Sequence, residues 1–299
     1  GISETQAEKI STVWQRRSAE TEDRSFLQTL GIGPGTVDKI IGRYGSRSRD
    51  VITRTPYRIC DEISGIGFKT ADQIALAQDI DRHAPERIDA AILHATAVIG
   101  QNGHCASDEA TIRKTVRDLV IVDDREIGLG MHRLLDDGRL VRDEIGGKPV
   151  IYEKRVLACE TRLAELLAAR VHSEDMTGTD LDGLIASSAQ AVGIPTLHEH
   201  QAVAIRTALS SRISVITGGP GSGKTASVNV LLHAFEAAEG PSRIALCAPT
   251  GRAAQRLFES TGRDASTIHR MLQYAPDMGG FTYDADNPLD IDLIVVDES

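Results

Sequence analysis

The sequence feature that most constrains the fold is a glycine-rich octapeptide, residues 218–225 (GGPGSGKT), which fits the pattern GxxxxGK[ST]. A β-branched run, Ile213–Thr217, precedes it and predicts a buried strand, and residues 226–235 follow with the apolar spacing of an amphipathic helix. In this context the loop N–H groups and the positive end of the helix surround a phosphate. The sequence therefore predicts an α/β domain that binds a nucleoside triphosphate. A glycine-rich turn that binds nothing is the disfavoured alternative.

Composition limits the remaining possibilities. The 299 residues suit two or three domains, and 41% hydrophobic with 25% charged residues is ordinary for a globular protein. No apolar run approaches a membrane span, and the polar first thirty residues predict no signal peptide. Four widely spaced cysteines favour a reducing, cytoplasmic location over a disulfide framework or a zinc site. The net charge of −10 argues against nucleic-acid binding through Lys and Arg alone, although helix N-termini also bind phosphate.

An internal repeat precedes the nucleotide motif. Residues 26–41 and 60–75 each predict a helix, a Gly-Ile-Gly triplet and a second helix, and the triplets start 34 residues apart. We expect the first glycine to end a helix in the left-handed conformation and the isoleucine to pack between the helices. The second glycine then leaves the N–H groups of the next helix uncovered for an anion such as a DNA phosphate. Two helix turns that use glycine without binding anything are the alternative.

The middle of the chain predicts three helices followed by a hairpin, which is the pattern of a winged helix. The predicted elements are helices over 88–99, from a Ser107 cap to about Val120 and over 125–137, and strands over 140–145 and 149–152. A helical spacer without a ligand is an equal alternative. The third helix has few basic residues, which argues against readout of the major groove. Helices over 156–171 and 182–191 follow, with a loop over 173–182 between them.

Several residues around the glycine loop have the chemistry of ATP hydrolysis. Gln201, one helix upstream, has an amide that can read adenine, and Lys224 can reach the β- and γ-phosphates. A strand over 244–247 is predicted, and a second apolar strand ends at Asp297 and Glu298. Asp297 and the Thr225 hydroxyl can hold Mg²⁺, and Glu298 can orient and deprotonate the attacking water.

Five segments resemble, in this order, motifs Q, I, Ia, Ib and II of superfamily 1 helicases. They are Gln201, GGPGSGKT (218–225), APTGRAA (248–254), STIH (266–269) and VVDES (295–299). The hairpin repeat resembles the N-terminal region of RecD-like DNA helicases. The resemblance covers about residues 20–299 and corresponds to the N-terminal portion of that family through motif II. It implies a multidomain fold, with an α-helical N-terminal region (tandem helix-hairpin-helix, then winged-helix-like) followed by a truncated α/β RecA-like P-loop domain. The implied limits are 1–24 for an N-terminal helical segment, 25–82 for the tandem helix-hairpin-helix, 83–155 for the winged-helix-like domain, 156–195 for a helical linker and 196–299 for the P-loop ATPase domain.

The resemblance also implies an activity: ATP hydrolysis with Mg²⁺, coupled to 5′–3′ movement on single-stranded DNA, with duplex junctions as further partners, in DNA repair and recombination. The implied catalytic residues are Lys224, Asp297 and Glu298, and the implied Mg²⁺ ligands are Thr225 and Asp297. The implied ATP-binding residues are Gln201, Gly218, Gly219, Pro220, Gly221, Ser222, Gly223, Lys224, Thr225 and Ala226. The implied DNA-binding residues are Gly31, Gly33, Gly65, Gly67, Lys69, Thr70, Thr250, Gly251, Arg252, Thr267 and His269.

The chain departs from the family pattern at several points. Val37 stands where a small residue is usual, which predicts weak phosphate binding or a purely structural role for the first hairpin. Motifs III to VI are absent, so we expect no unwinding by these residues alone. The family sheet order also implies a gap between the strand before the glycine loop and the strand at 293–296. The alternatives are a DNA-binding tether or loader with a non-productive ATPase half, and a small-molecule P-loop kinase.

Overall fold

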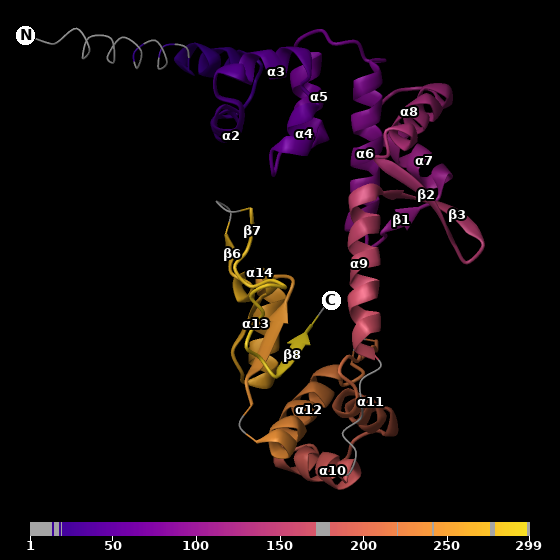
Figure 1. Ribbon diagram of the computed structural model, residues 1–299, viewed down its shortest axis with the longest axis vertical. Coiled ribbons are helices and arrows are strands. Elements are labelled where there is room, and N and C mark those ends of the chain that lie inside the picture. The colour runs from indigo at the N-terminus through magenta and orange to yellow at the C-terminus, as the bar shows by residue number, and fades with distance from the viewer. Residues whose placement is uncertain are drawn as a thin grey trace, which may run out of the picture. The chain divides into compact units, whose positions relative to one another are not determined.

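The computed structural model describes residues 14, 18, 20–171, 180–219, 221–240, 242–275 and 279–297. Most of the predicted helical segment 1–24, most of the loop 173–182, and the site residues Pro220 and Glu298 lie outside the described residues. The chain divides into two compact units, Gly1–Leu163 and Ala164–Ser299, and each is described by itself (Figure 1).

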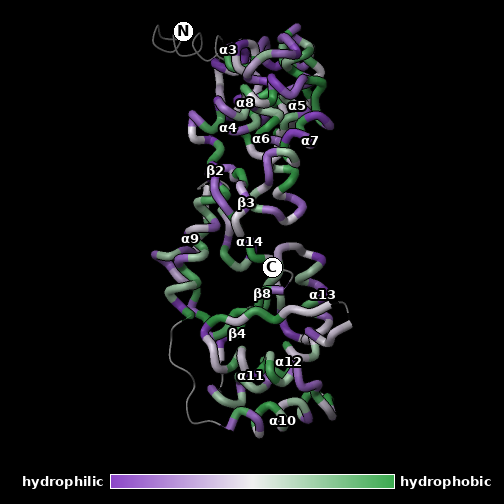
Figure 2. The backbone as a smooth tube through the Cα atoms, turned by 90° about the vertical axis from the view of Figure 1, so that its right-hand side faces the viewer, coloured by the Kyte–Doolittle hydropathy of each residue, from purple (hydrophilic) through white to green (hydrophobic). Residues whose placement is uncertain are grey.

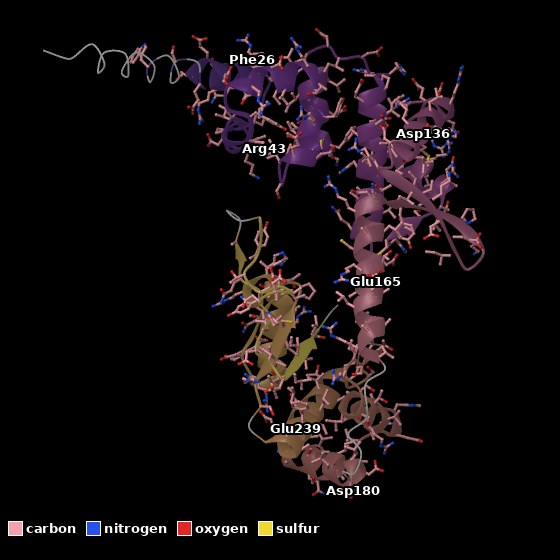
Figure 3. The ribbon with its side chains drawn as sticks, in the orientation of Figure 1. Phe26, Arg43, Asp136, Glu165, Asp180 and Glu239 are labelled. Atoms are coloured by element: carbon pink, nitrogen blue, oxygen red, sulfur yellow. The ribbon has the colours of Figure 1, made fainter. Side chains whose placement is uncertain are left out.

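The first unit begins with the two predicted hairpins. A helix over residues 20–29 precedes the first triplet, and Pro34 starts the next helix at a position where its missing N–H removes no hydrogen bond. Phe26 of the first helix packs against the Arg49 guanidinium, with 4.5 Å between Cζ and the ring centroid (Figure 3). The elements of this region are α2 (Pro34–Tyr44), a 3₁₀ turn η1 (Gly45–Arg47), α3 (Ser48–Arg54), α4 (Arg58–Glu62) and α5 (Phe68–Leu76). Both helix–triplet–helix predictions are confirmed.

The second part of this unit has the predicted winged-helix pattern of three helices and a hairpin. Its elements are α6 (Pro85–Gln101), β1 (Ala106–Ser107), α7 (Glu109–Leu119), α8 (Asp124–Asp136), β2 (Leu140–Ile145) and β3 (Lys148–Glu153). Gly146 and Gly147 have φ of +57° and +77°, the left-handed values that a two-residue hairpin turn requires. The antiparallel sheet has the order β1-β3-β2.

The prediction that Ser107 caps α7 is wrong. Ser107 lies in β1, paired with Ile151, and the neighbouring Asp108 caps the helix instead. The Asp108 carboxylate accepts a hydrogen bond from the Thr111 N–H at 2.9 Å. The backbone of Ser107 is committed to the sheet, so the next polar residue becomes the cap.

One hydrophobic core joins the hairpins to the winged-helix part. It includes Ile40 of α2, Ile74 of α5, Ile92 of α6 and Ile127 of α8, which are all buried. Within the first unit, the hairpins and the winged helix therefore pack together as one body.

A buried ion pair reinforces this packing. The Arg87 guanidinium of α6 donates to both carboxylate oxygens of Asp72 on α5, at 2.7 and 2.9 Å, and the Tyr57 hydroxyl donates to the same carboxylate at 2.7 Å. The side chains of Arg87 and Asp72 are only 8% and 14% exposed. Burial, followed by the bond to Asp72, raises the pKa of Tyr57. The three side chains satisfy one another and fix α5 against α6.

Helix α9 (Lys154–Val171) crosses the boundary between the units. None of its described side chains is buried, and Figure 3 shows them around Glu165 along the helix. Leu163 and Val171 are exposed on it. No helix among the described residues is both long enough and apolar enough to cross a membrane.

The second unit begins with three packed helices, α10 (Leu181–Ala191), α11 (Glu199–Ser210) and α12 (Lys224–Glu239). Ile185, Ile205 and Val230, one from each helix, share a buried cluster. Helix α12 also packs on the sheet, because its Leu232 lies in a cluster with Leu246. The helix predicted after the glycine loop is confirmed.

The sheet of the second unit is parallel, as an α/β domain requires. The remaining elements are β4 (Ile244–Ala248), α13 (Gly251–Thr261), β5 (Ala265–Thr267), α14 (Ile268–Met271), β6 (Tyr274–Ala275), β7 (Gly280–Phe281) and β8 (Leu293–Val296). The parallel strands have the order β5-β4-β8, and β6 and β7 form a separate antiparallel pair. β4 is hydrophobic along its length (Figure 2), as expected for a central parallel strand.

The strand predicted over Ile213–Thr217 is wrong. Residues 214–219 have no regular secondary structure, and Val215 is 82% exposed. A strand is stabilised by hydrogen bonds to a neighbouring strand, and among the described residues this segment pairs with neither edge of the sheet. β8 pairs only with β4 in the described sheet, and Ile294 and Val296 on it are 43% and 41% exposed.

We predict that Arg87→Ala lowers the free energy of unfolding of the first unit by about 3–5 kcal/mol, because it leaves the Asp72 carboxylate buried without its cation. Hydrogen exchange of the α5 and α6 amides measures the change. Arg54→Ala is the matched control: Arg54 is 77% exposed in its pair with Asp50, and its loss should cost less than about 1 kcal/mol. Equal effects of the two substitutions would contradict the assigned role of Arg87.

Candidate functional site

The glycine loop of the second unit has a backbone that only glycine adopts readily. Gly221 and Gly223 have φ of +76° and +77°, in the left-handed region. Gly223 is also the N-cap of α12, and a Cβ atom there would lie 2.2 Å from Nε2 of Gln201. The left-handed backbone therefore favours glycine at this position, and a larger residue would also have to displace the Gln201 amide.

The loop fits a phosphate group. The N–H groups of Thr225 and Ala226, at the start of the 16-residue helix α12, donate no hydrogen bond to a described residue. They point toward the loop as uncompensated donors at the positive end of the helix. Lys224 Nζ donates to the Gly218 and Gly219 carbonyls at 2.5 and 3.1 Å. This places the ammonium group within the loop, and a lysine has a third donor for an anion.

Gln201 links α11 to the loop. Its Oε1 accepts from the His198 N–H at 2.9 Å, as part of the N-terminal cap of α11, and its Nε2 donates to the Ser222 carbonyl at 3.2 Å. Both ends of the amide are thus bound within the chain. Nε2 carries a second N–H that can donate to adenine, and reading of adenine by Gln201 stays a prediction.

The carboxyl ends of the three parallel strands meet at one edge. Ala248 at the end of β4 is paired with Thr267 at the end of β5, so the segments 250–252 and 267–269 start side by side. The N–H of Asp297, just after β8, donates to the Cys247 carbonyl at 2.9 Å and brings this residue to the same edge. Ligands of α/β proteins bind at this edge.

The two threonines at this edge cap helices. Thr250 Oγ1 accepts from the Ala253 N–H and Thr267 Oγ1 from the Arg270 N–H, each at 3.2 Å. Each hydroxyl keeps its own proton for donation to a ligand. Gly251, Arg252 and His269 are exposed beside them.

The structure brings the predicted nucleotide residues together only in part. Gln201 contacts the glycine loop, but no hydrogen bond or ion pair between described residues joins Asp297 to Lys224 or Thr225. A shared Mg²⁺ site of Thr225 and Asp297 therefore stays a prediction. Burial raises the pKa of the Cys247 thiol on β4, so this thiol stays protonated at neutral pH. The described residues contain no cluster of three or more His, Cys, Asp or Glu that could hold a metal ion.

The two hairpins have the predicted geometry at their triplets. Gly31 and Gly65 are left-handed, with φ of +76° and +81°, and Ile32 and Ile66 are buried. Gly33 is the extended N-cap of α2, and a Cβ there would meet nothing within 4 Å. Gly67 caps α5 in the same way. Both helix starts are accordingly open to an anion.

The second hairpin offers more donors than the first. The N–H groups of Phe68 and Lys69 at the start of α5 donate to no described residue, whereas Pro34, which matches Phe68, has no N–H. Val37 is buried, as is the matching Ala71, so its larger side chain points into the core and not into the anion site. The first hairpin therefore has fewer N–H donors for an anion because of Pro34, and the sequence analysis did not predict this.

A lysine between the hairpins was also missed. Lys39 Nζ of α2 donates to the Ser64 carbonyl at 3.0 Å, and a Cβ on Gly65 would lie 2.9 Å from that nitrogen. The Lys39 ammonium thus lies beside the second triplet. No local sequence pattern points to this contact, because residues 25 positions apart form it through the tertiary packing.

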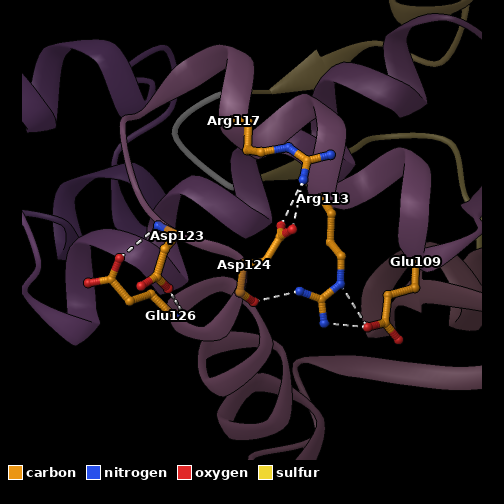
Figure 4. Close-up of polar contacts among 6 residues, drawn as sticks. All are labelled: Glu109, Arg113, Arg117, Asp123, Asp124 and Glu126. Atoms are coloured by element: carbon orange, nitrogen blue, oxygen red, sulfur yellow. Dashed lines mark hydrogen bonds and ion pairs between the residues drawn. The ribbon is translucent and has the colours of Figure 1, made fainter.

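The winged-helix part has few cations without an acidic partner on its second and third helices. Arg113 of α7 donates to the Glu109 carboxylate at 2.6 Å and to the Asp124 carbonyl at 2.8 Å (Figure 4). Arg117 donates to the Asp124 carboxylate at 2.8 Å. These pairs support the expectation that this part does not read the major groove.

Together, the glycine loop, helix α12 and the parallel sheet define a P-loop nucleotide-binding domain, and paired helix-hairpin-helix motifs precede it in the chain. A family model described as the ATP-dependent RecD2 DNA helicase HHH domain matches residues 16–106. A second model, described as an AAA domain, matches residues 201–299.

Curated relatives agree with these matches. The ATP-dependent RecD2 DNA helicase of Deinococcus radiodurans is 30% identical over 308 residues, which cover 100% of this chain and 42% of that protein. The RecBCD enzyme subunit RecD of Mycolicibacterium smegmatis is 42% identical over 123 residues, covering 34% of this chain and 22% of the relative. The RecBCD enzyme subunit RecD of Haemophilus influenzae is 37% identical over 121 residues, covering 33% and 19%. The chain spans less than half the length of these relatives. It belongs to the RecD-like family of DNA helicases.

We predict that Gly223→Ala disrupts the glycine loop, because alanine at a left-handed φ costs about 1–2 kcal/mol and its methyl group displaces Gln201. Faster hydrogen exchange over residues 218–226, without nucleotide, and weaker binding of a fluorescent ATP analogue are the expected results. Gly219→Ala is the control for exchange, since its Cβ meets nothing within 4 Å. Unchanged exchange in Gly223→Ala would overturn this account of the loop.

Proposed function

We propose that this chain belongs to a DNA motor that couples ATP hydrolysis to 5′–3′ movement along single-stranded DNA. The observation that carries the proposal is the shared edge of the parallel sheet. Residues 250–252 and 267–269, the proposed DNA contacts, lie beside Asp297 at the ends of strands on which the phosphate-binding helix α12 packs. A change at the nucleotide can reach the DNA contacts through this one sheet.

The proposed roles at the nucleotide follow from the side chains. Lys224 and the N–H groups of the α12 start bind the phosphates, and Gln201 reads adenine with the N–H and the oxygen lone pair that its bonds to Ser222 and His198 leave unused. Thr225 and Asp297 hold Mg²⁺, which when bound neutralises charge on the transferred phosphate. Glu298 orients the attacking water and accepts its proton.

The proposed contacts to DNA are sequence-independent. The hairpin glycines, Lys69 and Thr70 bind backbone phosphate at the start of α5, and duplex junctions are the proposed partners of this unit. The match of residues 16–106 to a RecD2 domain supports action as a separate helicase over action as a RecBCD subunit, as two relatives are named. The described cysteines are all unpaired, which agrees with the proposed cytoplasmic location. The proposed role is in DNA repair and recombination.

We predict that Lys224→Ala lowers ATP turnover by about 100-fold or more, because the phosphates lose their cation, and leaves DNA binding unchanged. Phosphate release is measured with and without single-stranded DNA, next to fluorescence anisotropy with a labelled oligonucleotide. Lys148→Ala, at an exposed lysine of β3, is the control and should change neither quantity.

The same assays separate the alternatives. Turnover that single-stranded DNA stimulates supports the motor. DNA binding without any turnover supports a tether or loader, and phosphoryl transfer to a small molecule without DNA supports a kinase. Turnover that persists in Lys224→Ala would falsify the role given to this lysine.

We predict that Gly67→Leu weakens DNA binding more than Gly33→Leu. A Cβ at either cap meets nothing within 4 Å and the backbone conformation is allowed there, so we expect both variants to fold, with a leucine side chain that covers the N–H groups at the helix start. The substitution in the second hairpin should cost more DNA affinity, because the first hairpin already lacks an N–H donor at Pro34. The slope of log affinity against log salt should fall by about 0.7–0.9 in Gly67→Leu, which is one phosphate contact. An equal loss in the two variants would show that the hairpins bind alike.

A further inference from the structure

Three aromatic rings meet on the surface of the second unit, in a cluster made of His269 on α14, Tyr274 on β6 and Phe281 on β7. The centroids of Tyr274 and Phe281 are 5.1 Å apart, and that of His269 is 5.8 and 5.7 Å from them. Tyr274 is 45% and Phe281 37% exposed, and His269 is exposed as well. This ring cluster is thus accessible to a ligand.

The cluster stands out in a chain with so few aromatic residues. Only 4% of the residues are aromatic, and Tyr44, Tyr57, Phe68 and Tyr152 are buried in the first unit. The rings of the cluster contact one another at angles of 56° to 74°, edge to face or tilted. These contacts stabilise the short β6–β7 pair, which two residue pairs alone would hold only weakly. They leave ring surface exposed, which this structural role does not explain.

Two exposed cations without an acidic partner among the described residues lie on the segments that follow the paired strands β4 and β5. Arg270 adjoins His269 on α14, and Arg252 starts α13 at the neighbouring strand end; both are exposed, and neither forms an ion pair with a described residue. Three other arginines of this unit are neutralised: Arg206 pairs with Asp182, Arg243 with Asp290 and Asp292, and Arg263 with Glu236. Exposed rings beside unpaired cations are the combination that binds the bases and phosphates of a single strand.

We propose that the ring cluster stacks on an unpaired base of single-stranded DNA, while Arg270 binds an adjacent phosphate. The inference rests on the proposed function and extends its DNA site from Thr267 and His269 to Tyr274 and Phe281. A flat base fits because stacking needs an exposed ring face and tolerates any sequence. The unpaired arginines favour a polyanion over an apolar protein surface as the occupant.

The test compares two oligonucleotides of equal length, oligo-dT and the same backbone with abasic sites, in anisotropy titrations with the 299-residue chain. The double variant Tyr274→Leu with Phe281→Leu keeps apolar contacts within the pair but loses the aromatic faces. Its affinity for oligo-dT should fall about tenfold, and its affinity for the abasic strand should stay the same. The single variant Tyr274→Trp keeps a stacking ring at this position and should bind oligo-dT at least as tightly as the original chain.

Phe258→Leu is the matched control, because Phe258 is 41% exposed on α13 and makes none of the ring contacts of the cluster. It should change neither affinity. A double variant that loses equal affinity for both strands, or for neither, overturns the stacking role, and equal loss assigns the rings to folding or to a protein contact. If the original chain binds neither oligonucleotide, the proposed function itself fails, which is a different result.

Discussion

The proposed chemistry of both units depends on helix starts that glycine leaves uncovered. Gly67 opens the start of α5, and left-handed Gly223 opens that of α12. In each case first-turn N–H groups without a described acceptor face outward at the positive end of a helix. This arrangement explains how a chain with a net charge of −10 can bind polyanions. The anions meet local backbone dipoles and a few cations that form no ion pair with a described residue, whereas Arg243 and Arg263 are paired with carboxylates.

In the first unit, the Asp72–Arg87 ion pair holds helix α5 against helix α6. Asp72 lies on the helix whose start forms the second anion site, and Arg87 lies on the long helix of the winged-helix part. Fixing α5 against α6 therefore also fixes the direction in which the Phe68 and Lys69 N–H groups point. Lys39 adds a link from the first hairpin to the loop of the second. Because Pro34 has no N–H to donate, we propose that the first hairpin serves mainly to position the second.

In the second unit, the edge at the carboxyl ends of the parallel strands brings the proposed site residues together. β4 is central, and the segments after β4, β5 and β8 supply Thr250, Thr267 and Asp297 to one edge. The ring cluster extends this edge through His269 to the β6–β7 pair. The proposed nucleotide and DNA contacts thus share one set of strands, which is the physical basis that we propose for coupling between them.

Patterns among neighbouring residues were enough to predict the elements that form locally. Glycine positions, apolar periodicity and strand-ending carboxylates predicted both hairpins, the winged-helix pattern, helix α12 and strands β4 and β8, because these depend on neighbouring residues. The tertiary structure decided the features that need a partner far along the chain. The segment 213–217 has strand composition but no adjacent strand, Gln201 is held by Ser222, and Lys39 reaches Ser64. The ring cluster likewise unites His269 with Phe281 only because β6 and β7 pair. Such contacts follow from packing, which no local pattern encodes.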